Sequence, residues 1–254
     1  MFWDYLRARL SLVIGFMVGV LVFILLLLYS DNFWVLIGFL PLYTILLRSF
    51  VKRVSIKTMH DLERSLYKEL KVLDYASKYE YLAHNGVKFD ERWTVTKFHN
   101  AILGNIFLGN TKKARNLIEF LEDSYGDFYG RNAVFKYMFE VLKTLHAMFF
   151  ETPHEFNTRK KTMLKTFESL PENVRKQIKA NEESFHNWIQ WIDKHILSKS
   201  SDKVDNLLKT VREMPKLNAA GAYFLLKKKD PALKDEKLDG YLRNAFIADE
   251  TLND

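Results

Sequence analysis

Two pairs of acidic and histidine residues have a spacing that can hold a metal ion. Glu151 and His154 form one pair, and Glu183 and His186 form the other. On a helix, a carboxylate and an imidazole three residues apart lie on one face, and two such pairs can bind two iron ions when further carboxylates complete the site. Pro153 lies inside the first pair and favours a loop there. We therefore predict no metal site and no cofactor.

Other patterns typical of catalysis are missing from the sequence. The chain has no cysteine, which excludes thiolate ligands and cysteine nucleophiles. It contains no glycine-rich phosphate-binding loop, no dinucleotide-binding fingerprint, no HExxH string and no GxSxG string. The sequence therefore favours a protein that is not an enzyme.

Positive charge gathers in three short clusters of a chain whose net charge is +7. Clusters at residues 159–161 and 227–229 predict a solvated surface, because acids are mixed with bases elsewhere and no nucleic-acid-binding motif occurs. We expect no nucleic-acid partner. The remaining cluster follows an apolar segment, where it should attract anionic lipid head groups. We call it the basic cluster; it consists of Arg48, Lys52, Arg53 and Lys57.

The first fifty residues are the most apolar part of the chain. Residues 10–29 carry no charge, and about twenty apolar residues in a helix cross the hydrocarbon core of a bilayer. A second apolar run covers residues 33–47 and reaches Val51 if Arg48 extends toward the membrane surface. The three polar residues 30–32 between the runs favour a turn. This pattern predicts a transmembrane helical hairpin over residues 1–54.

The distribution of positive charge predicts how this hairpin is oriented. Arg7 and Arg9 precede the first run and the basic cluster follows the second, whereas the turn carries only Asp31. The positive-inside rule then places both termini in the cytoplasm of a multi-pass cell-membrane protein. One alternative is a cleaved signal peptide, which the length of the first run disfavours. The other is a single span followed by a buried amphipathic helix, which the lack of a polar face in the second run disfavours.

Small residues recur every four positions in the first apolar run, at Ser11, Gly15 and Gly19. Such a stripe lets another helix approach closely, and residues 15–19 form a GxxxG motif. Two partners fit this stripe. One is the second helix of the same hairpin, which is always present and is slightly favoured. The other is a second copy of the chain, which would make a homodimer through Gly15 and Gly19.

After residue 54 the spacing of apolar residues becomes that of amphipathic helices. Leucines at 62, 66, 70 and 73 share one face of an expected connecting helix over residues 55–86. Only 10 glycines and 5 prolines occur in the chain, which favours long helices. We predict an all-α protein in which residues 87–240 form an α-solenoid-like stack of helical hairpins and residues 241–254 form a weakly ordered tail.

Turn-forming residues divide this stack into helices. Gly109 and Asn110 separate predicted helices over 93–108 and 112–124, the second capped by Thr111. Residues 152–153 separate helices over 133–150 and 155–170. Further helices are expected over residues 173–197, 202–212 and 218–229. Aromatic residues at helical spacing, among them Phe185, Trp188 and Trp191, predict core packing rather than a ligand groove.

The string AILGNIFLGNTKKAR, residues 101–115, resembles a tetratricopeptide repeat. In that family a glycine-polar turn separates two antiparallel helices, and a small residue lies where they cross. The resemblance covers about thirty residues and assigns the turn to Gly109 and the close crossing to Ala114. The small residue expected in the first helix falls on Ile102, and Gly104 lies two positions later. The resemblance implies a concave helical surface that binds a protein partner.

These features predict a membrane-anchored scaffold or adaptor that binds a protein partner through its cytoplasmic helical domain, without catalysis. One alternative is an immunity or accessory protein of a toxin or membrane machine. Another is a membrane-proximal enzyme that acts on lipid or uses a metal. A third is a lipid-organising protein whose basic face is the functional surface. The sequence does not identify the partner.

Overall fold

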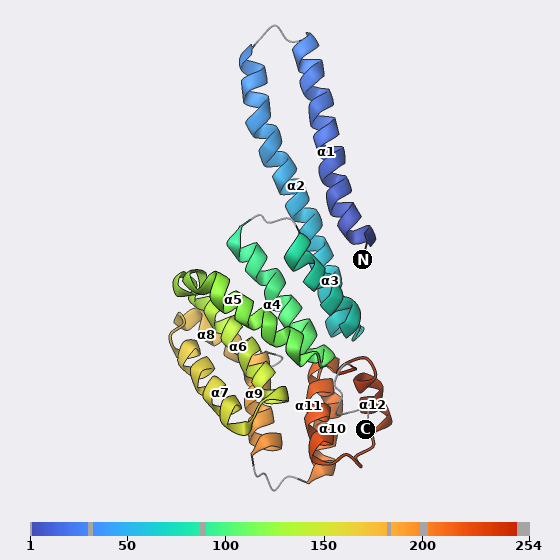
Figure 1. Cartoon of the computed structure of the whole chain (residues 1–254), viewed down its shortest axis with the longest axis vertical. Helices are drawn as coiled ribbons and strands as arrows, with labels where there is room; N and C mark the ends of the chain where they lie inside the picture. The colour runs from blue at the N-terminus through green and yellow to red at the C-terminus, as the bar shows by residue number, and fades with distance from the viewer. Residues whose placement is uncertain (1, 30–32, 87–89, 182–183, 199–202, 248–254) are drawn as a thin grey trace. The chain divides into compact units, whose positions relative to one another are not determined.

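Every regular element in the part of the chain that the structure describes is a helix, so the predicted all-α class is confirmed (Figure 1). The chain divides into two compact units, residues 1–64 and 65–254. This computed structural model describes residues 2–29, 33–86, 90–181, 184–198 and 203–247. Within the helices, the side chains of residues 2–9, 11, 12, 27 and 33–36 are outside the description.

The first unit is a hairpin of two long helices, α1 (Phe2–Tyr29) and α2 (Phe33–Tyr67), and the last three residues of α2 belong to the second unit. Both apolar runs are helical as predicted, and the predicted turn at residues 30–32 lies outside the described residues. The hydroxyl of Tyr43 in α2 donates a hydrogen bond to the carbonyl of Gly15 in α1. The rings of Phe23 and Phe39 lie 6.4 Å apart across the hairpin.

The glycines of α1 lie against α2. A Cβ atom at Gly15 would collide with the side chain of Leu47, and one at Gly19 would collide with the ring of Tyr43. The stripe of small residues therefore accommodates the second helix of the same hairpin, which is the first of the two alternatives. The side chain of Ser11, the third member of the stripe, lies outside the described residues.

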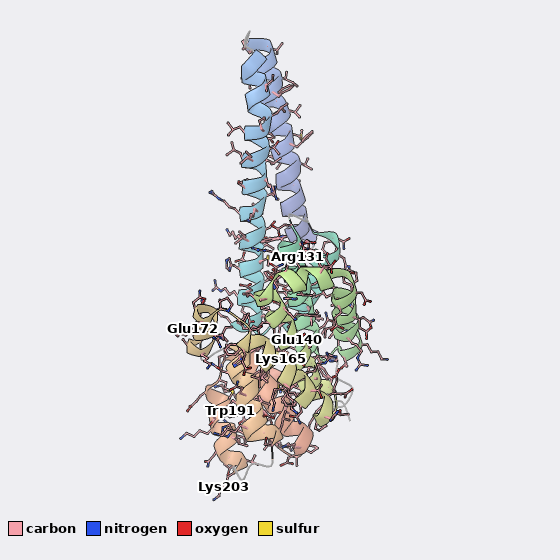
Figure 2. All side chains as sticks on the ribbon, turned by 90° about the vertical axis from the view of Figure 1, so that its left-hand side faces the viewer. Arg131, Glu140, Lys165, Glu172, Trp191 and Lys203 are labelled. Atoms are coloured by element: carbon pink, nitrogen blue, oxygen red, sulfur yellow. The ribbon has the colours of Figure 1, made fainter. Side chains whose placement is uncertain are left out.

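Elsewhere the hairpin leaves apolar side chains uncovered, and Figure 2 shows them standing out along both helices. Met17 of α1 is 65% exposed and Ile45 of α2 is 62% exposed. Among the residues that the structure describes, no helix combines the length and the apolar character that crossing a membrane requires. The transmembrane assignment thus gains no support from the helices themselves and stays a prediction.

The predicted connecting helix over residues 55–86 is wrong, because the chain breaks between α2 and α3 (Val72–Asn85). Leu70 adopts a left-handed backbone conformation with φ 55°, which costs about 1–2 kcal/mol for a residue with a side chain. The same residue is only 2% exposed, and burying a leucine side chain contributes about 1.5–3 kcal/mol. Burial therefore offsets the strain, and the helical periodicity of the leucines hid the break.

The second unit is a stack in which consecutive helices from α3 to α7 pack on one another. The bounds of its helices after α3 are α4 Glu91–Leu108, α5 Thr111–Arg131, α6 Ala133–Phe150, α7 Pro153–Glu168, α8 Glu172–Ala180, α9 Phe185–Ile192, α10 Val204–Glu213, α11 Lys216–Lys229 and α12 Glu236–Leu242. A π-helical turn, Asp193–Leu197, extends α9.

Local signals explain where most of these helices begin and end. Gly109 ends α4 in the left-handed conformation, with φ 84°, as the predicted turn requires. Asn110, rather than the predicted Thr111, caps α5 by accepting a hydrogen bond from the backbone N–H of Lys113. Thr152 and Glu155 form a capping box at the start of α7, so Pro153 belongs to the helix and not to a loop.

The predicted helix over residues 173–197 is also wrong, because it is divided between α8 and α9. The Ser184 hydroxyl accepts a hydrogen bond from the backbone N–H of Asn187, and the Asn187 amide donates to the carbonyl of Asn181 at 2.9 Å. These side chains form hydrogen bonds with backbone groups that a continuous helix would use, so α8 ends and α9 begins.

The chain beyond α12 is held by an aromatic side chain, so the prediction of a tail over residues 241–254 is wrong up to residue 247. Phe246 is 1% exposed, and its ring stacks on Phe224 with centroids 4.0 Å apart. Its backbone N–H donates to the carbonyl of Phe107 at 2.6 Å. The residues after 247 lie outside the description.

Helix α4 crosses α3 at close range at Gly104. A Cβ atom at Gly104 would lie 2.7 Å from the Cα atom of Ala76. Ala114 in α5 is fully buried, but its position accommodates a methyl group. At Gly104 the backbone of α3 leaves space only for a glycine. The glycine that lies two positions late for the repeat pattern therefore serves the crossing of α4 with α3.

We predict that Gly104→Ala destabilises the helical domain by about 1–3 kcal/mol, because the added methyl group forces two helix backbones apart. Gly130→Ala in α5 is the matched control. A Cβ atom at Gly130 meets nothing within 4 Å, so this change should stabilise by up to about 1 kcal/mol. Chemical unfolding of the full chain measures the free energy of unfolding of both variants. Equal stability of the two variants would contradict the close crossing of α3 and α4 at Gly104.

Candidate functional site

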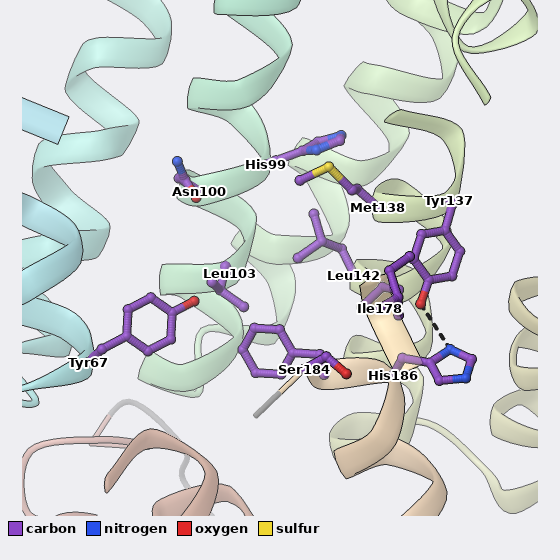
Figure 3. A pocket seen from close by; sticks show the side chains of 12 residues that line it. Tyr67, His99, Asn100, Leu103, Tyr137, Met138, Leu142, Ile178, Ser184 and His186 are labelled. Carbon is purple, nitrogen blue, oxygen red and sulfur yellow. Dashed lines mark hydrogen bonds between the residues drawn. The ribbon is translucent and has the colours of Figure 1, made fainter. Parts of the chain in front are cut away.

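A cavity of about 250 Å³ lies inside the second unit, between α4, α6 and the α8–α9 segment. Figure 3 shows the side chains that line it, with His99 from α4 and the pair of Tyr137 and His186 on different sides. Aliphatic side chains such as Leu103 and Leu142 form the wall between these polar groups. Two further lining residues, Tyr67 and Met138, are each more than 40% exposed, so the cavity communicates with solvent.

His99 is a buried histidine with one free ring nitrogen. Its Nε2 atom lies 2.9 Å from the hydroxyl of Tyr129, and its ring is parallel to the ring of Phe139. Burial lowers the pKa of His99 to about 3, so the imidazole is neutral at physiological pH. Its Nδ1 atom has no hydrogen-bond partner among the described residues. A buried polar atom in this state costs about 1–3 kcal/mol unless something binds it.

Tyr137, His186 and Gln190 form a hydrogen-bonded chain beside the cavity. The Tyr137 hydroxyl lies 2.9 Å from Nδ1 of His186, and Nε2 of His186 lies 2.9 Å from the amide nitrogen of Gln190. Burial is the main cause that lowers the pKa of His186, and the nearby charge of Lys179 lowers this pKa further. Burial raises the pKa of Tyr137 far above its ordinary value. Both groups are therefore neutral at physiological pH.

The residues that the sequence singled out lie elsewhere. The basic cluster is exposed on α2, and Gly15 and Gly19 lie within the hairpin. Gly109 and Ala114 belong to the α4–α5 hairpin. No described residue of these sets lines the cavity.

The described residues of the two acid–histidine pairs have other partners or are exposed. Glu151 lies 3.0 Å from His146 rather than beside His154, which is exposed. Glu183 lies outside the described residues, and His186 instead bonds to Tyr137 and Gln190. Within the described part of the chain, no group of three or more potential metal-binding side chains is found.

Lysines of the two other basic clusters bind groups of the domain itself, where a solvated surface was predicted. Lys160 forms an ion pair with Asp193 at 2.7 Å. Lys227 forms one with Asp239 at 2.8 Å. Lys228 donates to the carbonyl of Phe149 at 3.0 Å. These lysines tie α7 and α11 to neighbouring segments of the domain.

Comparison of the chain with protein-family models, with curated proteins and with solved structures finds no match. The resemblance of residues 101–115 to a tetratricopeptide repeat therefore stays a prediction.

The lowered pKa of His99 predicts a pH dependence of stability. Between pH 6.5 and about 3 the unfolded chain binds a proton that folded His99 does not, so stability falls as the pH falls. The slope is about 1.4 kcal/mol per pH unit from this residue alone. We expect His99→Gln to remove about that much of the slope between pH 4 and 6, measured by chemical unfolding. The exposed His154→Gln is the control, and equal slopes in both variants would contradict the burial of His99.

Proposed function

We propose that this chain is a membrane-anchored adaptor, in which the helical hairpin of α1 and α2 holds the second unit at a membrane where it binds a protein partner. The observation that carries the proposal is the uncovered apolar surface of the hairpin. Soluble monomers rarely expose contiguous apolar patches larger than a few hundred Å². Such a surface needs lipid or another protein to cover it.

The exposed side chains support lipid as the cover. Phe16 and Leu21 of α1 are 63% and 61% exposed, and Leu42 and Leu46 of α2 are 58% and 59% exposed. No charged residue occurs between Leu10 and Tyr29 in the sequence. Because the glycine stripe already faces α2, the outward surface of α1 is made of large aliphatic and aromatic groups, which suit acyl chains.

The position of the basic cluster supports the orientation. Its four side chains are exposed on α2 directly after the apolar run, where anionic head groups would meet them. Positive residues at such a place stay on the cytoplasmic side. The same helix continues to Tyr67, so the chain enters the second unit without leaving that side.

The adaptor role is supported by the architecture of the second unit. Stacked helical hairpins bury one face of each helix on the next and leave surfaces for a partner, and the resemblance to a tetratricopeptide repeat favours a protein. The two histidines that line the cavity, His99 and His186, are neutral at physiological pH. None of the described cavity-lining residues carries a carboxylate. This composition suits binding better than acid–base catalysis.

Topology can be tested directly, because the chain has no cysteine. We expect Asp31→Cys to react with a membrane-impermeant maleimide on intact cells, and Thr251→Cys to react only after permeabilisation. Changing the basic cluster to four glutamates should reverse or mix this pattern, because it removes the charges that retain the cytoplasmic side.

The control changes the same amount of charge in the second unit, at the exposed Lys112, Lys136, Lys165 and Lys209. This variant should keep the parental labelling pattern. Release of the parent protein from membranes by alkaline carbonate, or labelling of Thr251→Cys on intact cells, would overturn the anchoring proposal.

Partner binding is tested by a photo-reactive amino acid placed at Lys112 on α5 or Lys136 on α6, both exposed. The adaptor proposal expects a defined adduct with one protein in native membranes, and loss of that adduct when Gly104→Ala disturbs the stack. Adducts with lipid alone would contradict the adaptor role and favour the lipid-organising alternative.

A further inference from the structure

We propose that the cavity between α4, α6 and α9 binds a small, uncharged, mostly apolar molecule that carries a carbonyl oxygen, and that Tyr137 donates a hydrogen bond to that oxygen. This inference goes beyond the adaptor role and does not depend on membrane anchoring.

The size of the cavity limits the ligand. A dry apolar cavity of about 150 Å³ holds benzene. A cavity of about 250 Å³ holds a larger body, such as a phenyl ring with a short chain. Phe185, Leu103 and Leu142 supply apolar contacts for such a body.

The hydrogen-bonded chain leaves one donor for a ligand. The amide nitrogen of Gln190 can only donate, so Nε2 of His186 accepts from it. A neutral imidazole carries one hydrogen, which then lies on Nδ1 and is donated to the oxygen of Tyr137. The hydrogen of the Tyr137 hydroxyl is therefore left over. No described residue accepts it, and Tyr137 lines the cavity.

A second unpaired group points to the same cavity. The free Nδ1 atom of His99 belongs to a ring that lines it, and this side chain is 4% exposed. An unpaired buried nitrogen and an unused hydroxyl hydrogen in one apolar space are more costly together than either alone. A polar ligand that reaches one of these groups, or a water that such a ligand replaces, lowers this cost.

The walls select against charge. None of the described lining residues is Lys, Arg, Asp or Glu, and the lowered pKa values keep His99 and His186 neutral. A carboxylate or an ammonium group would lose its hydration without gaining an opposite charge. A carbonyl group loses much less hydration free energy than a charged group, and it accepts the hydrogen bond of Tyr137.

Three probes of similar size separate these contributions. They are 4-phenyl-2-butanone, which has the carbonyl; butylbenzene, which lacks it; and 4-phenylbutanoate, which is charged. Methionine-methyl NMR of the full chain in a mild detergent supplies the readout, because Met138 lines the cavity and Met163 is buried in α7 outside its lining. The ketone should shift the Met138 signal and leave the Met163 signal in place. It should bind about three- to tenfold more tightly than butylbenzene, and the carboxylate should not bind.

Two variants test the donor. Tyr137→Phe should reduce ketone affinity to that of butylbenzene and leave butylbenzene binding unchanged. Gln190→Leu changes an exposed residue, so folding should survive. Without the amide, Nδ1 of His186 can become the acceptor and take the Tyr137 hydrogen, so this variant should also lose the advantage of the ketone. Gln177→Leu, exposed on α8, is the matched control.

The outcomes are decisive in both directions. A ketone preference that both variants abolish supports the site and the direction of its hydrogen bonds. Equal binding of all three probes, shifts at Met163 as large as at Met138, or a ketone preference that survives Gln190→Leu would overturn the proposal. None of these results depends on where the hairpin inserts.

Discussion

The helical domain depends on one cluster of aromatic rings. Phe107 in α4 lies 5.7 Å from Phe149 in α6 and 6.2 Å from Trp188 in α9, measured between ring centroids. Phe224 in α11 and Phe246 complete the cluster, each within 6 Å of Phe149. Aromatic pairs of this kind contribute about 0.5–1.5 kcal/mol each beyond their burial. The cluster also positions the cavity, because Phe185 lines the cavity and lies 6.0 Å from Phe107.

Elements specified by local sequence could be predicted, and those specified by distant contacts could not. Gly109 ends α4 because a left-handed residue is needed there, and residues 133–150 form α6 with the predicted bounds. The break at Leu70 was hidden, since its cause is the burial of a leucine in an unusual backbone conformation. Phe246 falls within the predicted weakly ordered tail, because its partners Phe224 and Phe107 are distant in the sequence and leave no local signal.

The cavity had almost no signal in the sequence. Tyr137 and His186 are 49 residues apart, and nothing in the spacing of either residue indicates the other. The nearest available signal was the spacing of His186 and Gln190, which share a helix face at i and i+4. The spacing in the sequence instead pairs His186 with Glu183, three positions away, as potential metal ligands. His99 lies in an apolar stretch of α4. A histidine in such a stretch is either a buried structural group or a ligand-binding group. Only the residues packed around it in the fold, such as Tyr129, distinguish these two roles.

The polarity of the cavity is set from the protein surface. Gln190 is exposed, yet its amide decides which nitrogen of His186 carries the hydrogen, and hence whether Tyr137 has a hydrogen to offer inside. If His186 were protonated, both ring nitrogens would donate, Tyr137 would still accept, and its own hydrogen would stay free. The donor therefore persists in either protonation state of His186. Loss of the Gln190 amide nitrogen as a donor frees Nδ1 of His186 to accept, and this turns the hydroxyl hydrogen of Tyr137 away from the cavity.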